Sequence, residues 1–588
     1  MAFGYPIDGR VVEPGLPLVG PRTLVVSSPP LPPLFSLPPV GYVVPAPVAG
    51  FQNLIFPRLY FPRSFIDPRV ALDPAILIQM EGKRFMAGEG WMSSPEEEKK
   101  RKKVMEELKQ IVLSWIRKVA WQRRLPKDII ARTSATILAY GSYGLGVYGP
   151  ESDIDALCIG PYFASLEVSF ALHFGSVIWD TLKGSYPFSV FTLQDDFFTV
   201  LHGMLQSRSE VSELHCVKTA KVPLMRFKFN GISIDFPYAQ LRVVSVPADV
   251  NIFDPCLVIP DETSQRSFSG LRVNQRILQL VPNLKHFQAM LRCIKLWALR
   301  RGLYSNLLGF FGGIHLAILA AFVCLRYPNA SISALITLFF ETFSNWPWPN
   351  PVILQEQSIP SKKPDERCFM PILMPCSPFD WCNSNVTRGT FRKIMKEIKR
   401  GYDITKDQGR LDFQWCHLFN HFPFTESYNY FVRICLIAPD HDELQDWAGW
   451  VKSRLRGLLL KLEREHGFCD PNPKEYVDAN VNQPNVVFYW GLSSLGRVAI
   501  DLSSIKEEFM KSINKEEHSG YKNTNCKLEL SILHTSNLPK DLDLNYGSEK
   551  RTKACWRIMD YYNQHRKPAY SQYIPSYFIG YVASSGDQ

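Results

Sequence analysis

The sequence predicts a multi-domain protein of mixed α/β and α class, because its 588 residues leave room for three domains of ordinary size. Two observations predict this class. From about 130 to 245, glycine turns separate short alternating segments typical of strands, with helical stretches between them. Beyond 246, apolar residues recur at helical spacing, and after about 365 strand and helix patterns alternate again. We therefore divide the chain into 1–90, 91–245, 246–364, 365–545 and 546–588.

The first segment, residues 1–90, is rich in proline and has neither helical nor strand periodicity, as in Ser28-Pro-Pro-Leu-Pro-Pro33. Such a sequence favours extended polyproline conformation. A flexible tail is our interpretation, and a proline motif that binds a partner is the alternative. No basic stretch precedes a compact apolar run, as a secretory signal requires. The apolar segment Gly312 to Leu325 is too short to span a bilayer. We therefore expect a soluble protein without a membrane partner.

A helix is expected to begin after Ser94, because Ser94 can cap it, Pro95 suits its first turn and acidic residues follow. An apolar stripe at helical spacing runs from Val104 to Ile116. We expect this helix, at 95–120, to contribute to the central domain as well. Its polar face carries the basic run Lys99-Lys-Arg-Lys-Lys103. This run is either a nuclear localisation signal or a solvated helix face that pairs with the glutamates before it.

The segment at 139–159 predicts a strand, a tight glycine turn and a second strand. At Gly141-Ser142 the missing Cβ lets backbone N–H groups approach a phosphate. On the second strand, alternation places Asp153 and Asp155 on one face and Ile154 on the other. Two such carboxylates make a hard-oxygen site, which suits Mg²⁺ held together with substrate phosphates. The alternative is a loop and an edge strand with two solvated aspartates.

A third carboxylate follows on a β-hairpin at 226–239, whose turn is Asn230-Gly231. Asp235 lies on the returning strand after the alternating Ile232 and Ile234. Alone it would be a strand-end carboxylate. However, two metal ions about 4 Å apart need carboxylates from more than one strand. We therefore expect the upstream pair to bridge both ions, and Asp235 to hold the ion that activates the attacking oxygen.

Beyond 246, the segment at 283–301 predicts a helix with one apolar face and with Arg292 and Lys295 on the other. A lysine ammonium acts as a point charge and can clamp a nucleotide phosphate. A solvated surface lysine is the alternative for Lys295.

The carboxyl part predicts strands at 428–437 and 486–490 around a helix that begins after Asp440. This helix turns leucines inward and a basic face outward. Strand, helix and strand with aromatic-rich strands are consistent with an RRM-like RNA-binding fold, although the stacking signature of that module is missing. An α/β sandwich with a purely structural role is the alternative. We expect RNA contacts at four residues of the basic face: Lys452, Arg454, Arg456 and Lys461.

The amino-acid composition limits which kinds of partner and which cellular compartment are expected. The net charge of +10 favours a polyanionic partner without proving one. The 13 cysteines are odd in number and contain no Cys-x-x-Cys pair, which excludes a zinc module or a disulfide framework of the usual kind. They are interpreted as small buried hydrophobes in a reducing compartment.

Several longer motifs occur along the chain in the same order as in a known family, and the resemblance to that family depends on them. They are Tyr140-Gly-Ser-Tyr-Gly-Leu-Gly-Val147, Ser152-Asp-Ile-Asp-Ala-Leu-Cys158, Lys221-Val-Pro223, Gly231-Ile-Ser-Ile-Asp235, Ser267 to Leu278, Leu291 to Ala298, Leu303-Tyr-Ser-Asn306 and Gly309 to Ile314. From about 95 to about 540 the chain is similar to the eukaryotic poly(A) polymerases, which are DNA polymerase β-like nucleotidyltransferases. It is most like the shorter plant members.

This resemblance implies a polymerase β-like nucleotidyltransferase domain, a helical central domain and an RRM-like carboxyl domain. It implies template-independent addition of AMP from ATP to the 3′-hydroxyl of RNA, with two Mg²⁺ or Mn²⁺ ions held by the three aspartates. In the family, the Lys295 position reaches the phosphates and the Asn306 position faces adenine. The implied ATP site comprises Tyr140, Gly141, Ser142, Gly149, Asp153, Ile154, Asp155, Asp235, Lys295, Tyr304, Asn306, Gly313 and Ile314.

Two positions depart from the family's pattern. Gly144 stands where an arginine is usual, and Ser269 stands where an asparagine contacts the nucleotide. A serine hydroxyl makes fewer hydrogen bonds than an amide, so the departure bears on nucleotide selection. Three rival functions remain: a tail-adding enzyme that uses UTP, a synthase of 2′–5′ linked oligoadenylate, and an RNA-binding protein that has lost its activity. The intact glycine turn and all three aspartates argue against the last.

The resemblance also bears on partners and location. ATP and the 3′ end of RNA are the expected ligands, cleavage and polyadenylation factors are candidate partners, and a monomer is expected. Nuclear members often carry a long basic carboxyl extension, and this sequence stops at Gln588 without one. On the basic run at 99–103 we expect a nuclear location, with the cytoplasm as the alternative.

Overall fold

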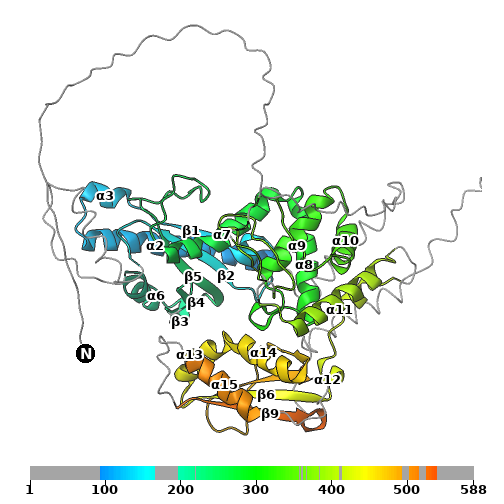
Figure 1. Cartoon of the computed structure of the whole chain (residues 1–588). Coiled ribbons are helices and arrows are strands. Elements are labelled where there is room, and N and C mark those ends of the chain that lie inside the picture. Colours follow the sequence, from blue (N-terminus) through cyan, green and yellow to red (C-terminus); the bar gives the residue numbers. More distant parts are fainter. Residues whose placement is uncertain are drawn as a thin grey trace, which may run out of the picture. The chain divides into compact units, whose positions relative to one another are not determined.

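The computed structural model describes 93–165, 196–218, 220–355, 358, 360, 362–365, 367–382, 385–408, 413–492, 502–514, 525–539 and 544 (Figure 1). Chain contacts divide the protein into Met1–Ile66 and Asp67–Gln588, and every described residue lies in the second unit. The proline-rich segment and the strand expected at 189–193 fall outside the described residues. In the part that is described, no helix has both the length and the apolar content needed to cross a membrane.

The first sheet has five strands in the order β1-β2-β5-β4-β3. They are β1 Thr136–Tyr140, β2 Ile154–Gly160, β3 Val211–Val217, β4 Leu224–Phe229 and β5 Ile232–Gln240. The β1–β2 pair is antiparallel, β2 and β5 are parallel, and β5, β4 and β3 are antiparallel. The predicted hairpin is confirmed: β4 and β5 join at Asn230 and Gly231, whose φ angles of 50° and 77° suit a tight hairpin turn.

One face of this sheet is covered by α2, Pro95–Gln122. The Ser94 hydroxyl accepts from the Glu97 N–H and the Glu97 carboxylate accepts from the Ser94 N–H, which confirms the expected helix start. The apolar stripe of α2 then buries Trp115 against Phe197 and Tyr238. The smaller helices α3 Lys127–Arg132, η2 Asp196–Leu201 and α6 His202–Gln206 complete this region.

The central part is helical, as expected. It contains α7 Glu262–Leu280, α8 Leu284–Arg300, η3 Asn306–Leu308, α9 Gly313–Arg326, α10 Ile332–Ser344, α11 Arg388–Thr405 and η4 Trp415–Phe419. Trp297 of α8 is fully buried between Phe339 and Phe340. Helix α11 contributes Ile394 and Ile398 to the same core, although it lies beyond the boundary expected at 365. Its packing groups it with the central helices, because its apolar face meets α10.

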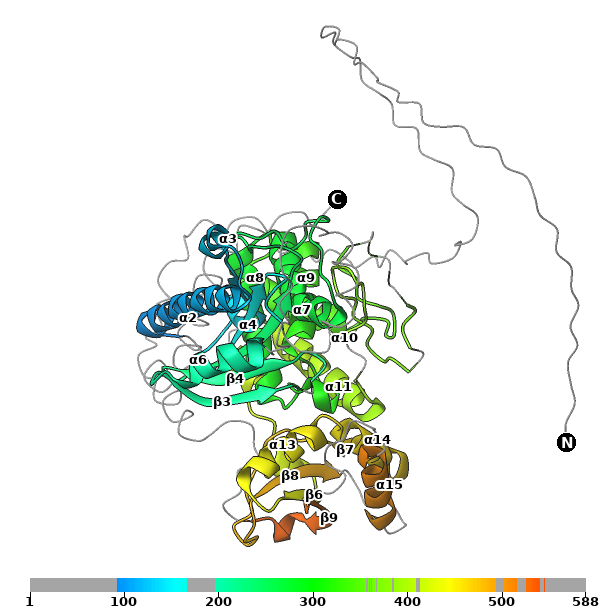
Figure 2. The ribbon, with the colours of Figure 1, turned by 90° about the vertical axis from the view of Figure 1, so that its left-hand side faces the viewer.

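The carboxyl part contains a four-stranded sheet in the order β7-β8-β6-β9. Its elements are α12 Phe424–Ser427, β6 Tyr430–Ile437, α13 His441–Lys452, α14 Leu455–His466, β7 Cys469–Asp470, β8 Asn485–Leu492, α15 Leu502–Asn514, β9 Lys527–His534 and η5 Thr535–Asn537. Helices α13, α14 and α15 pack on one face, as an RRM-like layering requires (Figure 2). The helix expected after Asp440 is two helices, because the chain turns at Ser453, whose hydroxyl donates to the Trp450 carbonyl.

The other face of this carboxyl sheet is also covered. Phe431 and Tyr489 point away from the helices and are 0% and 2% exposed. The segment around Phe424 and Tyr428 packs over them, together with Leu544. The aromatic side chains of this face are therefore part of a core. In the described structure they do not form the open platform on which an RRM stacks RNA bases.

Candidate active site

The turn between β1 and β2 is built around Gly141, which begins the short helix α4, Gly141–Gly144. Gly141 has a φ of +62°, and a Cβ there would lie 1.8 Å from Oδ2 of Asp155. Only glycine therefore lets the turn close over this carboxylate. Asn274 of α7 holds the turn from outside, since its Nδ2 donates to the Gly141 carbonyl at 2.8 Å.

Gly144, one of the two departures from the family pattern, has a structural explanation. A Cβ at this position would lie 2.8 Å from the Ala139 carbonyl oxygen and 3.2 Å from Nδ2 of Asn274. A larger residue would therefore force the backbone of β1 or the Asn274 amide to move. Ser269, the second departure, lies on α7 beside Gly270, at which a Cβ would meet the Tyr140 ring at 3.1 Å.

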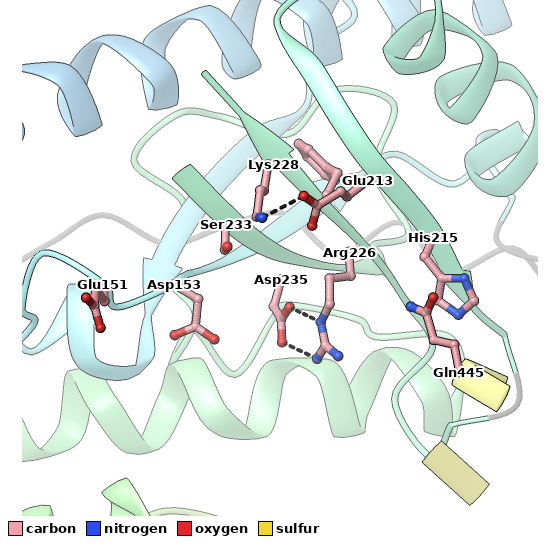
Figure 3. Close-up of a pocket in the computed structure, with 10 residues that line it drawn as sticks. Glu151, Asp153, Glu213, His215, Arg226, Lys228, Ser233, Asp235 and Gln445 are labelled. Carbon is pink, nitrogen blue, oxygen red and sulfur yellow. Dashed lines mark hydrogen bonds and ion pairs between the residues drawn. The ribbon is translucent and has the colours of Figure 1, made fainter. Parts of the chain in front are cut away.

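The sheet brings the predicted carboxylates together. Asp155 of β2 and Asp235 of β5 are direct partners across the parallel pair. Asp153 directly precedes β2 and is exposed, whereas Ile154 is buried beneath it, as the alternation predicts. Asp153 and Asp235 line one pocket of about 360 Å³, and Figure 3 shows both carboxylates on the same side of the strands. Asp153, Asp155 and Asp235 thus lie near one another on two adjacent strands.

These carboxylates repel one another. The pKa of Asp155 is raised to about 7, first by burial and then by the charges of Asp153 and Asp235. Lys295 of α8 acts in the opposite direction from the helix side, although its own pKa is lowered by burial. The cluster therefore carries an excess of negative charge, and a cation bound there would relieve the repulsion.

A protein cation already contacts one member of the cluster. Arg226 of β4 stands opposite Asp235 in the antiparallel register, and its Nε and Nη2 donate to Oδ1 and Oδ2 at 2.7 and 2.8 Å (Figure 3). Within the described residues, no group of three His, Cys, Asp or Glu side chains is arranged to hold an ion. The donor atoms nevertheless fit a hard divalent cation, because all three are carboxylates. To complete such a set around a cation, Asp235 would have to give up its contact with Arg226.

The residues expected to contact the nucleotide surround this cluster. Tyr140 ends β1, and its pKa is raised by burial and by Asp155. Lys295 lies with its Nζ 5.8 Å from the centre of the Tyr304 ring. Tyr304 is close to Gly313, where a Cβ would meet its hydroxyl at 3.1 Å, and its pKa is raised to about 12 by burial.

Other predicted contacts lie near the start of α9 or in the turns. Asn306 begins η3 and approaches Gly312, the residue before α9. Gly313 and Ile314 form the first turn of α9. Ser142 is in α4, and Gly149 is in the loop that leads to β2. Ile154 is fully buried, so its contact with a nucleotide stays a prediction.

The four basic residues assigned to RNA contact already have partners. Lys452 pairs with Glu475 at 2.9 Å, and Lys461 pairs with Glu508 at 2.6 Å. Arg454 stacks on the Trp450 ring, and Nε of Arg456 donates to the Asn385 carbonyl at 2.9 Å. Arg456 thus joins α14 to the segment before α11. Their contact with RNA stays a prediction.

Fold and site together define a nucleotidyltransferase, and comparison with known sequences identifies the family. The poly(A) polymerase nucleotidyltransferase domain matches residues 83–281, the poly(A) polymerase central domain 286–421, and the poly(A) polymerase predicted RNA binding domain 422–487. Nuclear poly(A) polymerase 3 of Arabidopsis thaliana is 48% identical over 85% of this chain and 93% of its own length. The chain therefore belongs to the poly(A) polymerase family, which confirms the resemblance.

Other relatives are more distant. Nuclear poly(A) polymerase 1 of Arabidopsis thaliana is 37% identical over 72% of this chain and 58% of its own length. Poly(A) polymerase pla1 of Schizosaccharomyces pombe is 34% identical over 67% and 65%. Among solved structures, a cytoplasmic RNA terminal U-transferase matches at 12% identity and a TM-score of 0.39, over 59% of this chain and 98% of its own. That likeness is too remote to inform the site.

Three residues of this site escaped the sequence analysis. Arg226 lies inside the hairpin motif, but its pairing with Asp235 depends on strand register. Asn274 lies on α7, more than a hundred residues from the turn that it holds. Arg101 belongs to the basic run, but its side chain donates to carbonyl oxygens of the 149–152 turn before Asp153, and no signal in the run distinguishes it from its neighbours. All three act across the fold, so that a local pattern could not reveal them.

Proposed function

We propose that this protein adds AMP from ATP to the 3′-hydroxyl of RNA without a template. The observation that carries the proposal is the pairing of Asp155 with Asp235 across β2 and β5, next to Asp153. Membership of the poly(A) polymerase family supports it. In this proposal residues 91–245 perform the reaction, the helices of 246–364 help to hold the nucleotide, and 365–545 serve RNA binding.

Members of the nucleotidyltransferase family generally use divalent metal ions, and here we propose two Mg²⁺ or Mn²⁺ ions. Asp153 and Asp155 would hold both, and Asp235 would complete one of the two sites. When bound, such ions lower the pKa of the attacking hydroxyl and neutralise charge on the phosphates. The raised pKa of Asp155 supports the assignment, because burial and the charges of Asp153 and Asp235 disfavour its ionised form, which a bound cation would favour.

The protein's own groups orient the substrates. The Gly141-Ser142 turn brings backbone close to the triphosphate, and Lys295 contributes a positive charge from α8. Tyr304 and Asn306 approach the start of α9 from the preceding loop and would contact the nucleoside. The contribution of these groups is mainly positioning and charge neutralisation.

Primer extension tests the function. Purified full-length protein is given an oligo(A) primer and each nucleoside triphosphate separately, with Mg²⁺ or Mn²⁺, and Asp235→Asn serves as the inactive control. We expect extension with ATP and 3′–5′ linkage in the product. Preferential extension with UTP, a 2′–5′ linkage, or no extension at all would each refute the proposal in favour of one rival.

We propose a nuclear location, because four Arabidopsis thaliana relatives are named as nuclear enzymes. We also propose that the protein is a monomer and that cleavage and polyadenylation factors are its partners.

The nuclear localisation signal is tested in a fluorescent fusion by replacing Lys99, Lys100, Lys102 and Lys103 with alanine. Arg101 is left in place, because it is buried. A wild-type fusion confined to the cytoplasm would refute the nuclear location. Unchanged nuclear fluorescence of the variant would show that this run is not the nuclear localisation signal.

A further inference from the structure

The basic run of α2 is not uniform. Lys99, Lys100, Lys102 and Lys103 are exposed, and Lys102 pairs with Glu98 at 2.7 Å. Arg101, in the middle of the run, is only 3% exposed. The run therefore combines solvated lysines with one inward-pointing arginine, and neither a solvated face nor a nuclear localisation signal explains the arginine.

Arg101 contacts the turn that leads to the second catalytic strand. Its Nη2 donates to the carbonyl oxygens of Gly149, Pro150 and Ser152 at 3.3, 2.8 and 2.6 Å. Its guanidinium also lies over the ring of Tyr148, 5.4 Å from the ring centre. One side chain thus holds several successive backbone groups of a single turn.

The same turn closes on itself. The N–H of Ser152 donates to the Gly149 carbonyl at 3.1 Å, and the Ser152 hydroxyl accepts from the Gly149 N–H at 2.9 Å. Asp153 is the next residue, placed between this turn and Ile154, where β2 begins. The position of Asp153 is therefore set by β2 on one side and by the turn on the other.

Folding stability alone does not explain this arrangement. Nη1 of Arg101 is buried and has no hydrogen-bond partner in the described structure. A buried polar group without a partner costs folding free energy. Even a buried ion pair can often be replaced by apolar side chains of similar volume without loss of stability, so a buried charge is weak evidence of a stabilising role. Stability and site geometry should therefore respond differently to loss of this guanidinium.

We propose that Arg101 is a positioning residue that fixes the 149–152 turn and thereby places Asp153 in the divalent-metal site. The metal-site part of this inference rests on the proposed function. The part that concerns the 149–152 turn does not. Partners that orient a metal ligand typically change metal affinity or activity by about 10–100-fold when they are removed. A change of that size is expected for Arg101→Met.

The first test needs neither metal nor substrate. Hydrogen exchange is measured on metal-free, full-length Arg101→Met, with Lys100→Met as the matched control on the same helix. We expect faster amide exchange in peptides covering 149–156 in Arg101→Met, with unchanged exchange across α7, and wild-type rates in the control. Unchanged exchange at 149–156 would overturn the inference, even if the protein proves to be an active polymerase.

The second test separates positioning from general structure. Binding of Mn²⁺ is titrated calorimetrically, and thermal unfolding is recorded for the same samples. We expect the Kd for Mn²⁺ to rise about tenfold or more in Arg101→Met, with partial recovery in Arg101→Lys, whose ammonium can still donate to carbonyls. Wild-type Mn²⁺ affinity in a folded Arg101→Met protein would refute the proposal. Failure of wild-type protein to bind Mn²⁺ would instead refute the metal site.

Discussion

Two aspartates, the partly buried Asp155 and the fully buried Asp470, show how differently this fold treats the same side chain. Asp470 is 0% exposed, and its carboxylate accepts from Lys393 Nζ at 2.9 and 2.6 Å and from the Tyr428 hydroxyl at 2.7 Å. Asp155 lies among other carboxylates, and Lys295 acts on it only at a distance. Asp470 therefore has a positively charged partner within the protein, whereas Asp155 has no such partner in contact among the described residues.

Under the proposed function, the difference separates a structural carboxylate, Asp470, from one that would bind a metal ion, Asp155. Lys393 belongs to α11 and Asp470 to β7, so that their pair joins the central helices to the carboxyl sheet. The aromatic rings around Lys393, with Phe422 at 4.2 Å, exclude water from the pair. At the catalytic strands the cluster stays open to the pocket. A permanent partner there would occupy the place of a metal ion.

The largest effect on activity is expected at the three carboxylates of the candidate active site. Each of Asp153→Asn, Asp155→Asn and Asp235→Asn should lower the rate of AMP addition at least about a hundredfold, because metal ions contribute several kcal/mol of charge stabilisation. Steady-state extension of an oligo(A) primer measures the rate, and circular dichroism checks the fold. Near-normal extension by a folded Asp235→Asn protein would remove Asp235 from the site.

At the Lys393–Asp470 pair, by contrast, we expect an effect on stability. Lys393→Met leaves the Asp470 carboxylate buried without its cation, which should lower the free energy of unfolding by about 3–5 kcal/mol. Denaturant titration measures this loss. The double variant Lys393→Met with Asp470→Leu should recover most of it, since the uncompensated charge is gone. If the single variant is as stable as wild type, the pair does not hold the two parts together.

The smallest effect concerns Arg226, whose guanidinium pairs with the Asp235 carboxylate. Its side chain is 58% exposed, and exposed ion pairs contribute about 0.2–1 kcal/mol. Arg226→Met should therefore tighten Mn²⁺ binding by at most about fivefold, because Asp235 no longer exchanges a partner. Calorimetric titration of metal-free protein checks this, with Lys228→Met on the same strand as the control. Weaker Mn²⁺ binding in Arg226→Met would mean that the arginine supports the metal site.

Much of this molecule follows from local sequence signals. Ser94 and Asp440 cap helices as predicted, and Asn230-Gly231 forms the predicted turn, because caps and tight turns depend on a few neighbouring residues. The convergence of Asp153, Asp155 and Asp235 was also predicted. Strand alternation predicts the common face of Asp153 and Asp155, and the family resemblance implies that all three carboxylates share one metal site.

The remainder depends on distant contacts. Nothing near Arg101 in the sequence indicates that it points inward, since a helix face is decided by what packs against it. The covered face of the carboxyl sheet likewise requires chain from both ends of that region, around Phe424 and Leu544. The break between α13 and α14 was missed because leucines continue at helical spacing across it.

The contact between Gly141 and Asp155 constrains how this enzyme can evolve. The methyl group that alanine would add at 141 falls on the carboxylate oxygen of Asp155. Alanine at 141 would therefore displace the Asp155 carboxylate, and the φ of +62° adds backbone strain for any residue other than glycine. In evolution, position 141 can change only together with the geometry around position 155, although the two residues lie on different elements.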